Sequence, residues 1–482
     1  MVKLSLALAL VAAVASPLMS ATRAATDYEY KTLDVDYAFD ENEEQPRSVI
    51  MMIPDGTGPN IFTLARTVLD PSLKTRLHID PYVSGTVQTH SSTSYITDSA
   101  SSATAYATGY KTYDEAIGVD HFKNPLGTVL EAAKSRGMVT GMVVTSRVTH
   151  ATPASFAAHV VQRDDEDTIA AQYVANKNLD FLLGGGLRHF NDSLIADLKS
   201  ADYSVVYNYQ ELLDYHAANV DAGALRVFGL FHKSHMTYEN NPQAQKHGYF
   251  VMIEGSRVDH AGHSNDPGTM AKEAITFDES VAVVLDFLES QPNTGLISAA
   301  DHGTGGLTLG RVSDYVWFPT ELQQQNMSTE IMAKQLGDLL ESDECAPGAN
   351  DTCKAALYAS AKDLLKQYTN VTELSDESGA TLVTAIAEAV DVSRDVEGDV
   401  LVELGHIISE PAAIGWTTIG HVGTDVNLYC KGPSALVSMC NGVHENTYIN
   451  KIMTNFLALE HQQDLETLKW RNFSTLQEPI GF

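Results

Sequence analysis

The chain has 482 residues, of which 44% are hydrophobic, so it is long enough to bury a large core. It carries 62 acidic and 31 basic residues, for a formal net charge of −31, which argues against nucleic acid or an anionic membrane surface as a partner. This charge also repels anionic substrates, so a site for such a substrate would need strong local positive charge, which metal ions could supply.

The N-terminus has the pattern of a secretory signal. One positive charge at Lys3 precedes an apolar run from Leu4 to Ala15, and small residues follow. The run is too short to span a bilayer comfortably, and no later segment reaches the roughly 20 apolar residues that a transmembrane helix needs. We therefore expect cleavage after residues 1–24, with an uncleaved anchor as the less favoured alternative. The mature protein is expected to be soluble and either secreted or held in a vacuole-like or periplasm-like compartment.

Apolar strand patterns alternate with helical patterns through the first two thirds of the chain. Helices are predicted between the strands, for example at residues 128–136 and 270–289, where apolar residues form one stripe. This alternation predicts an α/β fold with a central, mostly parallel sheet and helices on both faces. Buried strands are predicted at residues 48–53, 139–145, 181–183, 249–253 and 295–299.

The stretch from about residue 319 to residue 411 differs because it is rich in helical patterns. We expect it to be a surface insertion, and since no Pro/Gly/Ser-rich linker marks a boundary, residues 25–482 are expected to form a single domain. The stretch carries three of five Asn-x-Ser/Thr triplets, which support a secreted glycoprotein only in combination with the signal. The triplets begin at Asn191, Asn326, Asn350, Asn370 and Asn472.

The four cysteines form two close pairs in the sequence, Cys345 with Cys353 and Cys430 with Cys440. An even count in an exported chain indicates disulfides, although four cysteines allow three pairings. We predict the two local bridges, both with a structural role.

Clusters of polar residues follow several of the predicted strands, where ligands bind in a parallel sheet. A single Asp at such a position usually caps a helix, and a single His usually packs or forms a hydrogen bond. Several clusters on successive strand ends are hard to explain in that way. Carboxylate and imidazole groups together suit zinc, whereas carboxylate and hydroxyl groups suit magnesium. The residues are Asp55, then His150, Thr152 and Arg163, then Glu254, Asp259, His260 and His263, and finally Asp301 and His302.

Ser99 lies near the start of a run of small residues that ends at Gly109 and predicts a tightly packed helix. A hydroxyl at the start of a helix is usually an N-cap. The same position would also present free backbone N–H groups and the positive end of the helix dipole to a phosphate. Serine is a weak nucleophile at its ordinary pKa, and metal coordination is one way to activate it.

Six motifs occur along the chain, in the order Ile53–Gly58, Thr97–Ala105, Ala151–Ala154, Glu254–His263, Asp301–Gly306 and Gly415–His421. Together they make the chain similar to the alkaline phosphatases. The resemblance extends from about Arg47 to Asn455. The blocks that contain Asp259, Gly415 and His444 are most similar to the eukaryotic branch, including the fungal enzymes.

The resemblance implies a role for each matching residue. Ser99 would be the nucleophile that becomes phosphorylated, and Arg163 would clamp two phosphate oxygens. Two Zn²⁺ and one Mg²⁺ per subunit are implied, as are a homodimer and the hydrolysis of small phosphate monoesters in two displacements. The implied ligands are Asp259, His263 and His421 for the first zinc ion, Asp55, Asp301 and His302 for the second, and Asp55, Thr152 and Glu254 for magnesium.

Two positions depart from the common pattern of the family. His150 stands where bacterial members commonly have Asp, and imidazole favours zinc, so the metal at the magnesium position is left open. Gly303 stands where many relatives carry Glu. His150 and His260 are expected to lie beside the ligands without binding metal, and His444 is expected to be structural or to lie beside the site.

Two other functions are weaker alternatives. A sulfatase of the same architecture would need a Cys/Ser-x-Pro-x-Arg motif, which the sequence lacks, and a related phosphodiesterase would typically use Thr in place of Ser99. A non-enzymatic acidic glycoprotein that binds divalent cations would normally have lost the nucleophile or a ligand, and no matching position is lost. The sequence therefore predicts a secreted, metal-dependent alkaline phosphatase.

Overall fold

The computed structural model describes residues 47–459, apart from 220–224, 237–247, 312, 314, 343–344, 346–349, 394–395 and 397. The predicted signal at residues 1–24 and the triplet at Asn472 lie outside this range. Within it, no helix is long and apolar enough to cross a membrane.

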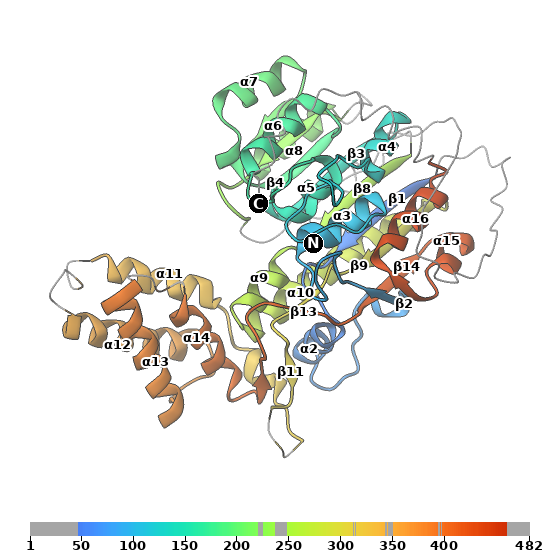
Figure 1. Cartoon of the computed structure of the whole chain (residues 1–482). Coiled ribbons are helices and arrows are strands. Elements are labelled where there is room, and N and C mark those ends of the chain that lie inside the picture. Colours follow the sequence, from blue (N-terminus) through green and yellow to red (C-terminus); the bar gives the residue numbers. More distant parts are fainter. Residues whose placement is uncertain are drawn as a thin grey trace.

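The chain is built around a sheet of ten strands (Figure 1). Every neighbouring pair is parallel except the two pairs that β14 forms, with β9 and with β2. The five predicted strands all occur, and the predicted fold class is confirmed. In spatial order the strands are β15 (Gly442–Glu445), β2 (Val83–Gln88), β14 (Val426–Lys431), β9 (Thr294–Ala299), β1 (Ser48–Ile53), β8 (Tyr249–Glu254), β3 (Val139–Arg147), β4 (Phe181–Gly185), β6 (Val227–Leu230) and β5 (Ser204–Val206).

Both faces of the sheet are buried, which explains the continuous apolar run of β1. Ile50 and Met52 pack into one hydrophobic cluster. Val49, Met51 and Ile53 pack into a second cluster on the opposite face. Because successive side chains of a strand point to opposite faces, a strand covered on both sides needs an apolar residue at every position.

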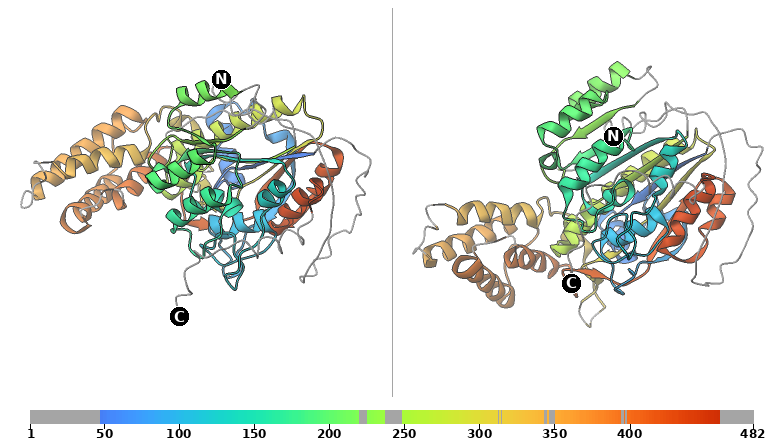
Figure 2. Two further views of the ribbon diagram at one scale, coloured as in Figure 1. Left: turned by 90° about the horizontal axis from the view of Figure 1, so that it is seen from above. Right: turned by 45° about the horizontal axis from the view of Figure 1, so that its top comes forward.

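Helices pack against both faces (Figures 1 and 2). The first cluster includes residues of α2 (Pro59–Leu69), α8 (Tyr209–Asn219) and α10 (Pro267–Leu288). The second includes residues of α3 (Ser99–Thr108), α4 (Val129–Ser135), α5 (Ala151–Ala157), α6 (Glu166–Asn176), α7 (Asp192–Ser200), α15 (Ser434–Met439) and α16 (Asn446–Phe456).

Four helices project from one side of the sheet and form a unit that we call the helical lobe (Figures 1 and 2). They occupy most of the stretch that the sequence predicts to be a helix-rich insertion, whereas the assignment of residues 25–482 to one domain stays a prediction. Both predicted disulfides are confirmed, with Cys345–Cys353 in the lobe and Cys430–Cys440 linking β14 to the end of α15. The lobe helices are α11 (Thr329–Leu340), α12 (Asn350–Tyr368), α13 (Asp376–Glu388) and α14 (Asp399–Ser409).

Short elements bring distant segments to the carboxyl edge of the sheet, where β1, β3, β8 and β9 end. The two-residue strands β10 (Gly303–Thr304) and β13 (His421–Val422) pair antiparallel, which places His421 opposite Thr304. A second small ladder joins β11 (Thr308–Leu309) to β12 (Ile414–Gly415). The remaining elements are α9 (Arg257–His263), directly after β8, and the short helical turns η1 (Asp80–Tyr82), η2 (Leu187–His189), η3 (Pro319–Leu322) and η5 (Ala389–Ser393).

Candidate active site

Three groups of side chains at the carboxyl edge could each hold a metal ion. Within each group, one potential ligand atom per residue lies within 4.8 Å of the others. The first two groups are the sets that the sequence resemblance assigns to zinc, and Asp55 is shared by two groups. The groups are Asp259, His263 and His421; Asp55, Asp301 and His302; and Asp55, His150 and Glu254.

In the first group, the rings of His263 and His421 face each other through their Nε2 atoms. His263 Nδ1 contacts the carbonyl oxygen of Ile419 at 2.5 Å, and His421 Nδ1 contacts that of Thr97 at 2.8 Å. A carbonyl can only accept, so both Nδ1 atoms are protonated, and in a neutral ring Nε2 then carries the lone pair. The two Nε2 atoms are 3.2 Å apart. Two nitrogens on a tetrahedral zinc ion would be about 3.3 Å apart, so this pair fits zinc.

Asp55, Asp301 and His302 form the second group, and all three side chains are fully buried. Asp301 Oδ1 accepts hydrogen bonds from the backbone N–H groups of Gly56 and His302, each at 3.1 Å. In the part of the chain that the structure describes, Asp301 Oδ2 and both carboxylate oxygens of Asp55 have no hydrogen-bond partner. Buried carboxylates without partners are costly, and burial followed by the charge of Asp301 raises the pKa of Asp55 well above its usual range. A cation bound here would remove that cost.

The third group combines a carboxylate with an imidazole, and Thr152 lies beside it. Over the described ranges, Glu254 Oε1, Thr152 Oγ1 and His150 Nδ1 are buried and lack hydrogen-bond partners. Burial raises the pKa of Glu254 to about 8. These oxygen and nitrogen atoms therefore also fit a divalent cation.

His150 also contacts Arg163, which limits its use as a ligand. Burial, and then the charge of Arg163, lowers the pKa of His150 well below its usual range, so the ring is neutral. Its Nε2 lies 3.1 Å from Arg163 Nη2 and accepts a hydrogen bond from the guanidinium. A neutral imidazole has one lone pair, so His150 either accepts this hydrogen bond or binds a cation, but not both. The arrangement leaves both roles open.

Ser99 is the first residue of α3 and lies next to the second ligand group. Its side chain is buried, and Oγ is 3.0 Å from His302 Nε2. Asp98 caps the helix by accepting a hydrogen bond from the backbone N–H of Ser101, and Gly109 ends it with φ = +79°. Every residue of α3 is buried, so the run of small side chains allows the helix to lie close to the end of β9. Ser102 fixes that approach by donating to the carbonyl oxygen of Asp301 at 2.9 Å.

Arg163 is held by Asp98, which also caps α3. Its Nη1 forms an ion pair with Asp98 Oδ2 at 2.9 Å. Although burial alone would raise it, the charge of Arg163 brings the pKa of Asp98 below its usual range. No local pattern in the sequence predicts this contact, because the two residues lie 65 positions apart.

Thr304 is a second residue of the site that was not predicted from the sequence. Its Oγ1 donates to Asp259 Oδ1 at 2.5 Å and lies 3.3 Å from His302 Nδ1, so it contacts one ligand from each of the first two groups. Its position within the Asp301–Gly306 motif was the only available signal, and the residue type alone gave none.

Of the two other histidines named from the sequence, His260 and His444, the structure places the first beside the site and the second in an edge strand. His260 lies beside the site, where its ring centroid is 5.8 Å from that of His150, and its Nδ1 lies 2.9 Å from Arg257 Nη1. His444 stacks on Tyr448 at 4.6 Å in the edge strand β15 and belongs to none of the three groups.

The shifted pKa values predict how the stability of the metal-free protein depends on pH. Burial raises the pKa of Glu254 to about 8, and the charge of Asp259 raises that of His263 to about 9. Both groups bind more protons in the folded than in the unfolded chain, so the free energy of unfolding falls as pH rises from about 6.5 to 8. Burial lowers the pKa of His260 to about 3 and that of His302 to about 4. These two groups make the free energy of unfolding rise with pH, but this rise is complete above pH 6.5.

We therefore expect the midpoint of thermal unfolding of the chelator-treated protein to fall over this pH window, as measured by scanning calorimetry. The metal-loaded protein is the control, because its ligands have already lost these protons, and the gap between the two midpoints should widen with pH. A gap that narrows towards pH 8 would contradict these pKa shifts.

Comparisons with a family model, with related sequences and with solved structures all find alkaline phosphatases. The family model described as alkaline phosphatase matches residues 46–246 and 241–459. The repressible alkaline phosphatase of Saccharomyces cerevisiae is 33% identical over 88% of this chain and 83% of its own length. The alkaline phosphatase of Schizosaccharomyces pombe is 32% identical over 88% of this chain and 84% of its own length. Among solved structures, the cold-active alkaline phosphatase from a psychrophilic Shewanella species has a TM-score of 0.69 and 29% identity, covering 85% of this chain and 99% of that one.

Proposed function

The chain belongs to the alkaline phosphatase family and is a phosphomonoesterase, and from this premise we propose that it acts through a phosphoserine intermediate on Ser99. The observation that carries the proposal is the position of Ser99 Oγ, 3.0 Å from His302 Nε2 at the start of a buried helix. Arg163 is anchored to Asp98, the residue next to Ser99. The guanidinium is therefore held near the nucleophilic hydroxyl.

We assign two Zn²⁺ and one Mg²⁺ to the site, with His150 as an additional candidate ligand at the third position. The support is the set of buried carboxylate oxygens without hydrogen-bond partners and the facing Nε2 atoms of His263 and His421. When bound, these ions supply the positive charge that stabilises the attacking and leaving oxygens of an in-line displacement and offsets the acidity of the chain. The assigned ligands are Asp259, His263 and His421; Asp55, Asp301 and His302; and Asp55, Thr152 and Glu254.

The reaction consists of two displacements at phosphorus. In the first, Ser99 Oγ forms a bond to phosphorus, the ester bond breaks, and the alcohol leaves. In the second, water attacks the phosphoserine, the bond to Ser99 Oγ breaks, and inorganic phosphate is released. Arg163 binds two nonbridging oxygens through its planar fork, and the start of α3 presents the positive end of the helix dipole to the phosphate. Asp98 holds the guanidinium in place throughout.

The test is hydrolysis of p-nitrophenyl phosphate and bis(p-nitrophenyl) phosphate before and after chelation. We expect turnover of the monoester, little turnover of the diester, loss of activity on chelation, and recovery with zinc and magnesium. The rate should rise into the alkaline range because protons compete with the ions for the ligands Glu254 and His263, which have pKa values of about 8 and 9 in the metal-free protein. Preference for the diester, activity that resists chelation, or an acidic optimum would contradict the proposal.

Export and assembly belong to the same proposal. We infer that residues 1–24 are a cleaved signal, that the mature chain is a secreted glycoprotein or resides in a vacuole-like compartment, and that two copies form a homodimer. The two disulfides support an oxidising compartment.

A further inference from the structure

The helical lobe contacts the segment that directly follows the ligand-bearing helix α9. This segment, Ser264–Asp266, joins α9 to α10. Its central residue, Asn265, is almost completely buried and has φ = +49°, a left-handed conformation that Asn tolerates better than most residues. A buried polar residue in this conformation needs hydrogen bonds that hold it there.

The side chain of Asn265 makes three such bonds. Its Nδ2 donates to the carbonyl oxygen of Gly262 at 2.9 Å and to that of Thr418 at 3.0 Å. Both acceptors are carbonyls, which fixes the orientation of the amide, so Oδ1 must accept from His406 Nε2 at 2.9 Å. His406 lies on α14 of the helical lobe.

These bonds connect the two segments that carry the facing histidine ligands. Gly262 directly precedes His263, and Thr418 lies three residues before His421. His263 Nδ1 also donates to the carbonyl oxygen of Ile419, the residue after Thr418. Asn265 and His263 thus tie α9 to the same stretch of chain, the one that leads to His421.

The lobe leaves this segment little room to move. A Cβ atom on Gly405 of α14 would lie 2.4 Å from the carbonyl oxygen of Ser264 and 2.6 Å from that of Asn265, so only glycine allows the close approach. At the start of α11, the backbone N–H of Thr329 donates to Asp266 Oδ2 at 2.8 Å.

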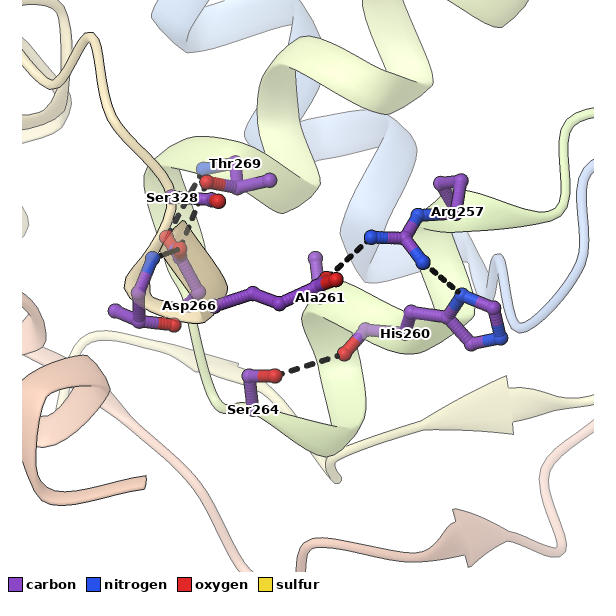
Figure 3. Close-up of a pocket in the computed structure, with 9 residues that line it drawn as sticks. Arg257, His260, Ala261, Ser264, Asp266, Thr269 and Ser328 are labelled. Atoms are coloured by element: carbon purple, nitrogen blue, oxygen red, sulfur yellow. Dashed lines mark hydrogen bonds and ion pairs between the residues drawn. The ribbon is translucent and has the colours of Figure 1, made fainter. Parts of the chain in front are cut away.

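A further anchor joins α11 to α9. Arg257 of α9 forms an ion pair with Glu330 of α11. Figure 3 shows the small cavity at this junction, with Asp266, Thr269 and Ser328 on one side and Arg257 and His260 on the other.

We propose that Asn265 is a positioning residue through which the helical lobe sets the separation of His263 and His421, and with it the zinc affinity of the first ligand group. The inference rests on the metal site of the proposed function. It assigns the lobe a task at the active site, although none of the ligands comes from the lobe.

The test measures the dissociation constant for zinc by competition with a chromophoric chelator at fixed pH. Loss of a group that orients metal ligands typically weakens metal affinity by about 10- to 100-fold, and in Asn265→Ala we expect a loss of that size for one bound zinc ion, the one at the first ligand group. His406→Phe, which removes only the hydrogen bond from the lobe to the side chain of Asn265, should lose less. Because His406 acts through Asn265, the double variant should bind zinc no more weakly than Asn265→Ala alone.

The matched control is Asn450→Ala, which removes another buried Asn that donates to a backbone carbonyl, that of Ala107 at 2.7 Å. The proposal is overturned if folded Asn265→Ala keeps the wild-type zinc affinity, if the control loses as much, or if the two substitutions add. If Asn265→Ala does not fold, a wild-type zinc affinity in His406→Phe overturns the proposal. Zinc affinity is read without substrate, so the result does not depend on whether the protein hydrolyses phosphate monoesters.

Discussion

Ser99→Ala is expected to lower kcat for p-nitrophenyl phosphate by about 10³-fold or more and to leave the metal content unchanged. The substitution removes the atom that would accept the phosphoryl group. It leaves Asp55, Asp301 and His302 in place and removes the 3.0 Å contact of Ser99 Oγ with His302 Nε2. Steady-state kinetics together with elemental analysis of the purified variant would check both parts.

A second buried serine provides the control. Ser155 on α5 is fully buried, and its Oγ contacts the carbonyl oxygens of Ala100 and Ala151, but its own side chain is not one of the assigned ligands. Ser155→Ala should therefore keep nearly full activity. If Ser99→Ala kept substantial turnover, water would have to attack the ester directly, and the phosphoserine mechanism would be wrong. If it lost metal, its inactivity would report on the binding of the ions instead of on the nucleophile.

The sheet could be predicted because its strands are buried on both faces. The continuous apolar runs at residues 48–53 and 249–253 fit a parallel strand in the middle of a sheet, and β1 and β8 are neighbours there. The rule that ligands bind at the carboxyl ends of such strands then led to Asp55, Glu254 and Asp301, which follow or end three neighbouring strands. These residues meet because parallel strands in register end together.

The contacts made between distant loops could not be predicted in the same way. His421 reaches the site through two-residue strands that pair with Gly303 and Thr304, and two residues are too few for a recognisable strand pattern. The antiparallel insertion of β14 between β9 and β2 is set by packing, with no local signal in the sequence. Asn265 shows the same limit, because its bonds to Thr418 and His406 span 153 and 141 residues.

The acidic site creates a conflict between stability and function that centres on Asp55. Its carboxylate is fully buried and shared by two of the three ligand groups. Over the described part of the chain, neither of its oxygens has a hydrogen-bond partner. In the metal-free protein this carboxylate therefore contributes desolvation cost and repulsion of Asp301, and no hydrogen bond in the described part of the chain offsets that cost.

Asp55→Asn should therefore change the stability of the metal-free and metal-loaded proteins in opposite directions. The amide keeps the shape of the side chain but removes the charge, so the variant is expected to lose two metal ions per chain and nearly all monoesterase activity. Its metal-free form should unfold at a higher temperature than metal-free wild type, because a costly buried carboxylate has been removed, whereas addition of zinc and magnesium should raise its midpoint far less. Calorimetry with and without the ions, together with metal analysis, gives all of these quantities.

Asp278→Asn separates this effect from the general consequence of replacing a buried carboxylate. Asp278 is also buried, but it accepts hydrogen bonds from the backbone N–H groups of His78 and Ile79 at 2.7 and 2.9 Å. Its replacement should destabilise the protein by about 1–3 kcal/mol with or without metal and leave the metal content intact. If Asp55→Asn lowered the stability of the metal-free protein in the same way, or kept all its metal, Asp55 would be a structural carboxylate and not the shared ligand of two sites.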